Sequence, residues 1–297
     1  MRSPHVRAAR PEGVARVPAG PLAAAGFAAL WHPELLLSMA CVGAAYLEVV
    51  GPLRRRFPDA APVPVPRRLG FLVGLLCLYA AQGSPLELLA NRYLLSAHVV
   101  QMVLVVFVAT PLWLEGLPPW LLRPLLRRPA LGRLVRHWTR PQTALPLFIG
   151  AFSLFLLPPL TDLGLADPWV YSGEHALLGV AAVCLWWPAT SQVPEAPAMD
   201  VGARLLFLFM IEVFMTLPFA LITFAPRPLY PAYAAAPRVF GLSALTDQQL
   251  AGILMRLGSG VSFGILLVRT FFAWAAREPA RDPGLLPRVR PEAGGPP

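Results

Sequence analysis

The sequence predicts an all-α membrane protein, a polytopic bundle of about seven transmembrane helices. Of its 297 residues, 56% are hydrophobic and only 14% are charged. The mean hydropathy of +0.58 lies outside the range of soluble domains. Seven apolar runs approach the roughly 20 residues that a helix needs to cross the hydrocarbon core of a bilayer. Most of the surface of such a chain faces lipid, so the lipid bilayer is one of its expected partners.

The runs follow one another between polar loops, with approximate ends. They are Trp31–Val50, Leu69–Gly83, Tyr93–Leu114, Gln142–Leu160, Trp169–Thr190, Leu205–Phe224 and Leu250–Ala275. The second run is the shortest, and the first begins beside a tryptophan, a residue favoured at the membrane interface. The last follows Thr246-Asp247, which predicts an N-cap with negative charge at the start of that helix. We expect one transmembrane domain over residues 29–276, after an N-terminal tail (1–28) and before a disordered basic cytoplasmic tail (277–297) rich in Pro and Gly.

Arginine placement predicts the orientation, because cytoplasmic loops carry an excess of basic residues. All 25 basic residues are arginine, and they gather at 54–68 between the first two runs and at 123–140 between the third and fourth. Segments 84–92, 161–168 and 226–249 are poor in arginine and are expected outside. The N-terminus is then outside and the C-terminus in the cytoplasm, as in a multi-pass membrane protein.

Several classes of function are disfavoured by composition. The net charge of +9 resides mainly in loops beside apolar helices, where anionic lipid headgroups explain it without a nucleic-acid partner. The cysteines at 41, 77 and 184 lie within apolar runs, and no two of them stand close enough in the sequence to form a CxxC or CxxxC motif. This indicates that they are small core residues. No nucleophile with a base and no phosphate-binding glycine loop occurs, so the sequence does not predict an enzyme.

Two histidines lie at one predicted depth. His98 is about five residues inside the third run and His175 about six inside the fifth, which places both roughly 7 to 9 Å below the outer edge. An ionisable group inside a membrane segment is costly unless it faces protein or a ligand, so both are candidates for a functional site. Met102 and Gln101 share the helical face of His98. Imidazole with thioether is a donor set that suits copper, Cu(I) above all. The alternative from the spacing alone is that His98 hydrogen-bonds across the bundle and Met102 fills the core.

Further polar residues complete the candidate site. His32, at the outer edge of the first run, is a candidate third metal ligand. Gln101, Glu174, Asp247 and Gln248 are candidates to orient the ligated histidines by hydrogen bonds, although Asp247 as a helix cap is an equally good interpretation. Deeper in the membrane, Arg256 needs an acidic partner, for which Glu212 is the candidate.

The chain resembles the membrane-embedded CtaG-type assembly factors of bacterial cytochrome c oxidase. The resemblance rests on motifs in a fixed order along most of the chain. They are Ser84-Pro85-Leu86, His98 with Gln101, Pro111-Leu112, Tyr171-Ser172-Gly173-Glu174-His175, Trp186-Trp187-Pro188, Leu229-Tyr230-Pro231 and Asp247-Gln248-Gln249-Leu250-Ala251-Gly252. In that family pattern a second histidine directly follows Gln101, whereas this chain has Met102.

The resemblance implies a non-catalytic, seven-span factor of the bacterial inner (cytoplasmic) membrane that assists copper supply or insertion at the outer face of that membrane. Its implied partners are cytochrome c oxidase subunits and a periplasmic copper chaperone. Three alternatives stay open: a redox protein with His98 and His175 as axial ligands of a haem, a transporter, and a metal-free assembly scaffold. A transporter is the less favoured of these, because its pathway needs polar groups in both leaflets.

Overall fold

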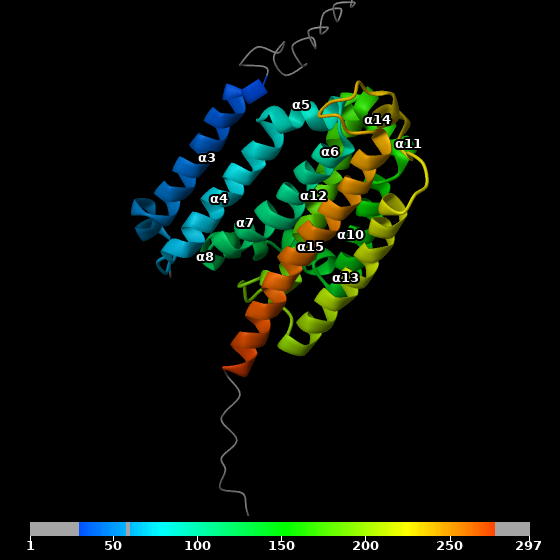
Figure 1. The fold of residues 1–297 in the computed structure, drawn as a ribbon. Helices are drawn as coiled ribbons and strands as arrows, with labels where there is room; N and C mark the ends of the chain where they lie inside the picture. The colour runs from blue at the N-terminus through cyan, green and yellow to red at the C-terminus, as the bar shows by residue number, and fades with distance from the viewer. Residues whose placement is uncertain (1–29, 58–59, 277–297) are drawn as a thin grey trace, which may run out of the picture.

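The computed structural model describes residues 30–57 and 60–276, and within these ranges the chain is helical with no strand (Figure 1). The predicted tails, 1–28 and 277–297, lie outside the described residues. The helical elements are α3 (Pro33–Val50), η1 (Pro52–Arg56), α4 (Val65–Gln82), α5 (Pro85–Arg92), α6 (Leu95–Val103), η2 (Leu104–Ala109), α7 (Thr110–Gly116), α8 (Pro119–Leu126), α9 (Pro129–Trp138), α10 (Pro141–Phe155), α11 (Pro158–Ala166), α12 (Pro168–Thr190), α13 (Val201–Thr223), α14 (Pro231–Ala235) and α15 (Ala244–Ala275). The fold is all-α, as the sequence predicts.

All seven apolar runs are helical, and the fourth is divided between α10 and α11. In the described part of the chain, four helical segments are long and apolar enough to cross a membrane: α3, the continuous stretch Leu95–Gly116, α13 and α15. The number rises to six if the bent pairs α4 with α5 and α10 with α11 each make one span. Helix α12 is also long, with 23 residues, but it is not among these candidates. A total of seven spans and the direction of the chain across the membrane stay predictions.

Two predicted helix boundaries are wrong. The fourth run was expected to continue to Leu160, but α10 ends at Phe155 and the chain bends by 67° into α11. Pro158 causes the bend, because a proline has no N–H to donate and forces the residue before it into an extended conformation. The last helix begins at Ala244, six residues before the expected start, and its N-cap is Ser243 rather than Asp247. The Ser243 side chain accepts the backbone N–H of Thr246 at 3.1 Å.

The main core lies where α6, α10, α12, α13 and α15 meet. Trp186 of α12 is buried there, stacks on Phe263 of α15 with ring centroids 4.8 Å apart, and donates to the carbonyl of Val106 at 2.8 Å. That carbonyl belongs to η2, one turn of π-helix whose irregular hydrogen bonding leaves backbone groups for side chains to satisfy. Gly258 lets α15 approach α6, since a Cβ atom there would lie 2.4 Å from Cγ1 of Val103.

The predicted pairing inside the membrane segments is confirmed. Arg256 of α15 donates to the carboxylate of Glu212 on α13 and lies 3.4 Å from the Glu212 carbonyl oxygen. The pair ties together the two helices that pack most extensively along each other, and it removes the cost of an isolated guanidinium in lipid.

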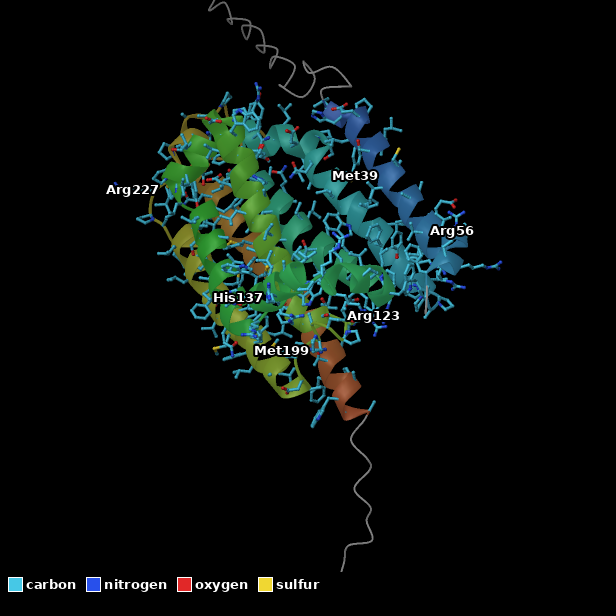
Figure 2. The ribbon with its side chains drawn as sticks, turned by 180° about the vertical axis from the view of Figure 1, so that it is seen from behind. Met39, Arg56, Arg123, His137, Met199 and Arg227 are labelled. Atoms are coloured by element: carbon cyan, nitrogen blue, oxygen red, sulfur yellow. The ribbon has the colours of Figure 1, made fainter. Side chains whose placement is uncertain are left out.

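The ends of the bundle differ in charge. Helix α3 begins at one end, and α15 finishes at the opposite end (Figure 1). Seen from behind, Arg123 and Met199 lie toward the end where α15 finishes, and Arg227 lies nearer the other (Figure 2). The arginine-rich segments at 54–56 and 123–140 therefore belong to the end predicted to face the cytoplasm. Helices α5, α6, α11 and α14 gather at the end predicted to face outward (Figure 1).

Candidate functional site

The structure brings His98 and His175 into contact near the predicted outer end of the bundle. Their ring centroids are 6.0 Å apart and their planes are perpendicular. His98 lies on α6 and is 5% exposed. The ring of Phe155, at the end of α10, stacks on His98 at 4.9 Å and meets His175 edge-on at 5.2 Å. The two imidazoles therefore share one aromatic wall inside the protein.

The two rings present different nitrogen atoms. Nδ1 of His175 lies 2.8 Å from the carbonyl oxygen of Tyr171, and because a carbonyl only accepts, Nδ1 carries the hydrogen. Nε2 of His175 is then the nitrogen with a lone pair for a ligand. Nδ1 of His98 is buried and has no hydrogen-bond partner. A buried polar atom without a partner is expensive, so this nitrogen marks a place where a ligand or ordered water would be stabilised.

Met102 and Gln101 take different places on α6. Met102 lies one helical turn after His98, is 3% exposed and belongs to the main core, so its thioether faces protein rather than lipid. Gln101 does not hold a histidine as expected. Its Nε2 atom donates to the carbonyl of Ala81 at 2.8 Å, which fixes α6 to the end of α4, while its buried Oε1 atom has no partner.

Asp247 holds the start of α6 instead of orienting a histidine, which corrects the predicted role. Its carboxylate accepts the backbone N–H groups of Leu95 at 2.7 Å and Ser96 at 3.2 Å, and also the Ser96 hydroxyl. The N-cap residue of α6 is Leu94, whose side chain has no acceptor, so the cap comes from a helix 152 residues away. Asp247 thus positions His98 through the backbone of its helix.

Gln248 and Glu174 are also not hydrogen-bonded to the histidines, contrary to expectation. Gln248 is 2% exposed and bridges two backbone groups of another region: its Oε1 atom accepts Leu229 N–H at 2.6 Å, and its Nε2 atom donates to the Ile222 carbonyl at 3.0 Å. Glu174 packs over Gly164 of α11, where a Cβ atom would lie 2.6 Å from its Oε2 atom. Backbone groups therefore take up the polar atoms of Gln248, whereas the Oε1 atom of Glu174 is buried without a hydrogen-bond partner.

His32 is not available as the third metal ligand that the sequence suggested. Its Nδ1 atom lies 2.8 Å from the carboxylate of Glu34, and its Nε2 atom lies 3.0 Å from that of Glu87 on α5. Both ring nitrogens are therefore occupied. The hydrogen bond with Glu34, with further attraction to Glu87, raises the pKa of His32 above its usual value of 6.5. This ion pair joins the start of α3 to α5.

Tyr171 is a site residue that sequence reasoning missed. Its ring lies 3.9 Å from that of His175. Its buried hydroxyl lies near the amides of Asn91 and Gln101 without a hydrogen bond of normal geometry. Asn91 in turn donates to Glu87 at 3.2 Å. The available signal was the spacing, because Tyr171 stands one helical turn before His175. A series of polar groups therefore leads from His32 at the outer edge to the imidazoles of His175 and His98.

The donor set at this site is small. Within residues 30–57 and 60–276, no group of three or more His, Cys, Asp or Glu side chains is arranged to hold a metal ion. The described cysteines are free thiols scattered over α3, α4 and α12. Two imidazoles and one nearby thioether remain. Such a set suits an ion that accepts few, soft ligands, and it does not make a closed structural site.

Comparison with known proteins agrees with the resemblance seen in the sequence. Residues 44–277 match the family model described as cytochrome c oxidase caa3 assembly factor (Caa3_CtaG). No curated protein and no solved structure matches the chain. The family match includes α4 through α15 and therefore both histidines, Tyr171 and Asp247. Because it extends over well more than half of the sequence, the chain belongs to the family of cytochrome c oxidase caa3 assembly factors.

Proposed function

We propose that this assembly factor holds Cu(I) transiently between His98 and His175 and passes it to a cytochrome c oxidase subunit that is being assembled. Copper is cargo here, and the protein is not a catalyst. One observation carries the proposal: the buried imidazole of His98 is in ring contact with the half-buried imidazole of His175, and Nδ1 of His98 has no partner among the described residues. A buried nitrogen without a partner is costly, so a ligand bound at this atom would be stabilised.

The chemistry of the donors favours Cu(I). Imidazole accepts copper in either common oxidation state, whereas thioether favours the reduced ion. The carbonyl of Tyr171 fixes the orientation of His175, as the backbone often does for histidines that bind metals. Met102 supplies a thioether one turn from His98. Two or three neutral ligands bind copper more weakly than a cluster of thiolates, and exchangeable binding is what delivery requires.

Location supports the same role. The imidazole pair lies toward the end of the bundle predicted to face outward from a bacterial inner membrane. The polar groups of His32, Glu87 and Asn91 connect the pair with that surface. A periplasmic copper chaperone would therefore approach at α5 and α11 and load the site without crossing the membrane, and an oxidase subunit would unload it from the same side.

Two alternatives make different predictions for the same residues. A haem with His98 and His175 as axial ligands would need space for a macrocycle, and the rings of Phe155, Tyr171 and Tyr233 are already packed around the imidazoles. That packing favours a single small ion. A purified protein with a Soret band would establish the haem alternative. A metal-free scaffold predicts normal oxidase assembly after both histidines are replaced.

The test is copper stoichiometry in the purified chain. The protein is purified in mild detergent under reducing conditions, loaded with Cu(I), desalted and analysed for copper per chain. We expect about one copper in the parent and a large loss in His98→Ala and in His175→Ala. The matched control is His137→Ala, which removes an exposed histidine at the other end of the bundle.

A companion variant separates the thioether from the imidazoles. Met102→Leu keeps the volume of the core but removes the sulfur, so we expect weaker retention of Cu(I) against a competing chelator with a folded protein. Equal copper in the parent and both histidine variants would contradict the proposal, as would a parent with no copper above background. Oxidase assembly in cells that carry the same variants then tests delivery.

A further inference from the structure

Helix α9 (Pro129–Trp138) is a short helix in the arginine-rich segment between α7 and α10. It has 10 residues, and at a rise of about 1.5 Å per residue it extends roughly 15 Å, or half the hydrocarbon core of a bilayer. His137 of α9 lies in the half of the molecule where α15 finishes, as does Arg123 of α8 (Figure 2). The helix therefore belongs to the predicted cytoplasmic end of the bundle and does not cross the membrane.

One stripe of α9 packs against the protein. Gly132 and Thr139 are buried, and Val135 between them packs against a small core cluster that includes Leu126 and Trp187. Gly132 permits this close contact, since a Cβ atom there would lie 2.2 Å from the carbonyl oxygen of Leu126. Because residues three or four positions apart share one face of a helix, these three residues define the side of α9 that the bundle covers.

A second stripe is apolar and exposed. It consists of Ala130, Leu134 and Trp138, each four residues after the one before. Leu134 is 55% exposed and Trp138 is 41% exposed. Tryptophan is enriched at the boundary between membrane and water, and leucine is favoured in the acyl region. In a chain whose apolar helices can cross a membrane, the bilayer is the apolar phase that this stripe can enter.

The third stripe is basic. It contains the exposed residues Arg133, Arg136, His137 and Arg140. Residues 116–161 include six arginines and no Asp or Glu, so the segment has no carboxylate of its own to balance them. In the part of the chain that the structure describes, the ion pairs do not include these three arginines, whereas Arg123 and Arg127 of α8 pair with Glu195. The basic stripe is therefore free to meet an anionic surface.

We propose that α9 binds the cytoplasmic surface of an anionic bilayer, with its apolar stripe in the acyl region and its arginines at the lipid phosphates. A helix with Leu and Trp on one side and basic residues on another is typical of helices that lie in the membrane interface. Anionic lipid is the expected partner, because each basic residue near a negatively charged surface strengthens binding roughly fivefold. This contact is independent of copper.

The contact has a consequence for α10, which begins directly after α9 at Pro141. The Thr143 hydroxyl of α10 donates to the His137 carbonyl and lies 3.1 Å from the carbonyl oxygen of Arg140. These bonds hold the turn between the two helices. The level of α9 in the membrane interface therefore sets the level at which α10 enters the membrane.

Site-directed spin labelling of the full chain in lipid nanodiscs tests the proposal. The three cysteines are first replaced by alanine, and one nitroxide is attached through Leu134→Cys on the apolar stripe or His137→Cys on the basic stripe. Oxygen dissolves in the acyl region, whereas a neutral nickel complex stays in water. In phosphatidylglycerol discs we expect the label at position 134 to collide mainly with oxygen and the label at position 137 mainly with the nickel complex.

The same label at position 134 tests the role of lipid charge. Replacing Arg133, Arg136 and Arg140 by Gln should lower the ratio of oxygen to nickel collisions roughly fivefold or more, and so should exchanging phosphatidylglycerol for a phosphatidylcholine with the same acyl chains. The matched control replaces Arg54, Arg55 and Arg56 of η1 by Gln, which removes three charges at the same end of the bundle and should leave the ratio unchanged. Circular dichroism checks that each variant keeps its helix content.

Three results would overturn the proposal. Free access of the nickel complex to the label at position 134 in phosphatidylglycerol discs would place α9 in water. Shielding of that label from both reagents would mean that protein covers the apolar stripe, either residues 277–297 or a second copy of the chain. Equal ratios in phosphatidylglycerol and phosphatidylcholine would mean that the arginines do not recognise anionic headgroups.

Discussion

Removing the carboxylate of Asp247 should destabilise the protein far more than removing an ordinary helix cap. Asp247 is 1% exposed and accepts the N–H groups of Leu95 and Ser96 at 2.7 and 3.2 Å. In Asp247→Ala those two buried donors lose a charged acceptor. A hydrogen bond to a charged group contributes about 1.5 kcal/mol or more, so the two backbone bonds together give a loss of about 3 kcal/mol. The Ser96 hydroxyl is left out of this sum, since it can rotate to another acceptor.

The matched control is Asp167→Ala. Asp167 caps α12 with a single local bond to Trp169 N–H at 2.8 Å, at a partly exposed position, so its loss should cost about 1 kcal/mol. The assay is reversible unfolding in mixed detergent and SDS micelles, followed by circular dichroism, which gives the free energy of unfolding of each variant. Equal losses for Asp247→Ala and Asp167→Ala would refute the argument that the distant, buried cap holds α6.

Asp247→Asn gives a second view of the same contact. The amide keeps the shape of the carboxylate and one acceptor oxygen, but it turns an N–H₂ group toward a backbone N–H donor. The Asp247→Asn protein should therefore be destabilised nearly as much as Asp247→Ala. It should also weaken copper retention, because the start of α6 sets the position of His98. An Asn variant with the stability of the parent would show that shape, and not the charged acceptor, matters at this position.

Two further changes test the packing and the outer edge. Gly258→Ala places a Cβ atom 2.4 Å from Val103 Cγ1 and should lower the free energy of unfolding by about 1 to 3 kcal/mol. Adding Val103→Ala should restore most of this loss. A double variant that shows no rescue in the same unfolding assay would contradict the contact. His32 has a pKa raised by its hydrogen bond to Glu34, so its contribution to stability is complete below about pH 6.5 and is lost as the pH rises through the raised value. His32→Gln should therefore be less stable than the parent at pH 6 and similar to it at pH 9, and a difference that is independent of pH would argue against the ion pair.

The sequence predicted the fold class well because the rule behind it is strict. In lipid every backbone polar group must be satisfied inside the chain, so long apolar runs become helices. The boundaries were less predictable. Pro158 ended α10 earlier than the apolar run suggested, and Ser243 began α15 earlier, because a hydrogen-bonded cap, which hydropathy does not register, decides where a helix starts.

The candidate site, like the helix boundaries, was only partly predictable from the sequence. Depth along two runs placed His98 and His175 at one level, and the structure brings their rings to 6.0 Å. The helical spacing of Met102 put its thioether on the face of His98. Tyr171 was missed as a site residue, since one tyrosine in an apolar run is ordinary until its ring is seen against a histidine.

What the sequence determined by itself was the class, the family and the common level of the two histidines along their helices, since hydropathy, motif order and helical rise depend only on local residues. Tertiary structure alone decided which polar atoms are already used. Asp247, Gln248 and His32 were all candidates for the copper site, and each is occupied elsewhere: by the start of α6, by backbone beyond α13, and by Glu87 of α5. Those partners are far away in the sequence, and whether they meet depends on how each helix is rotated and packed, which the spacing of residues along one helix does not specify.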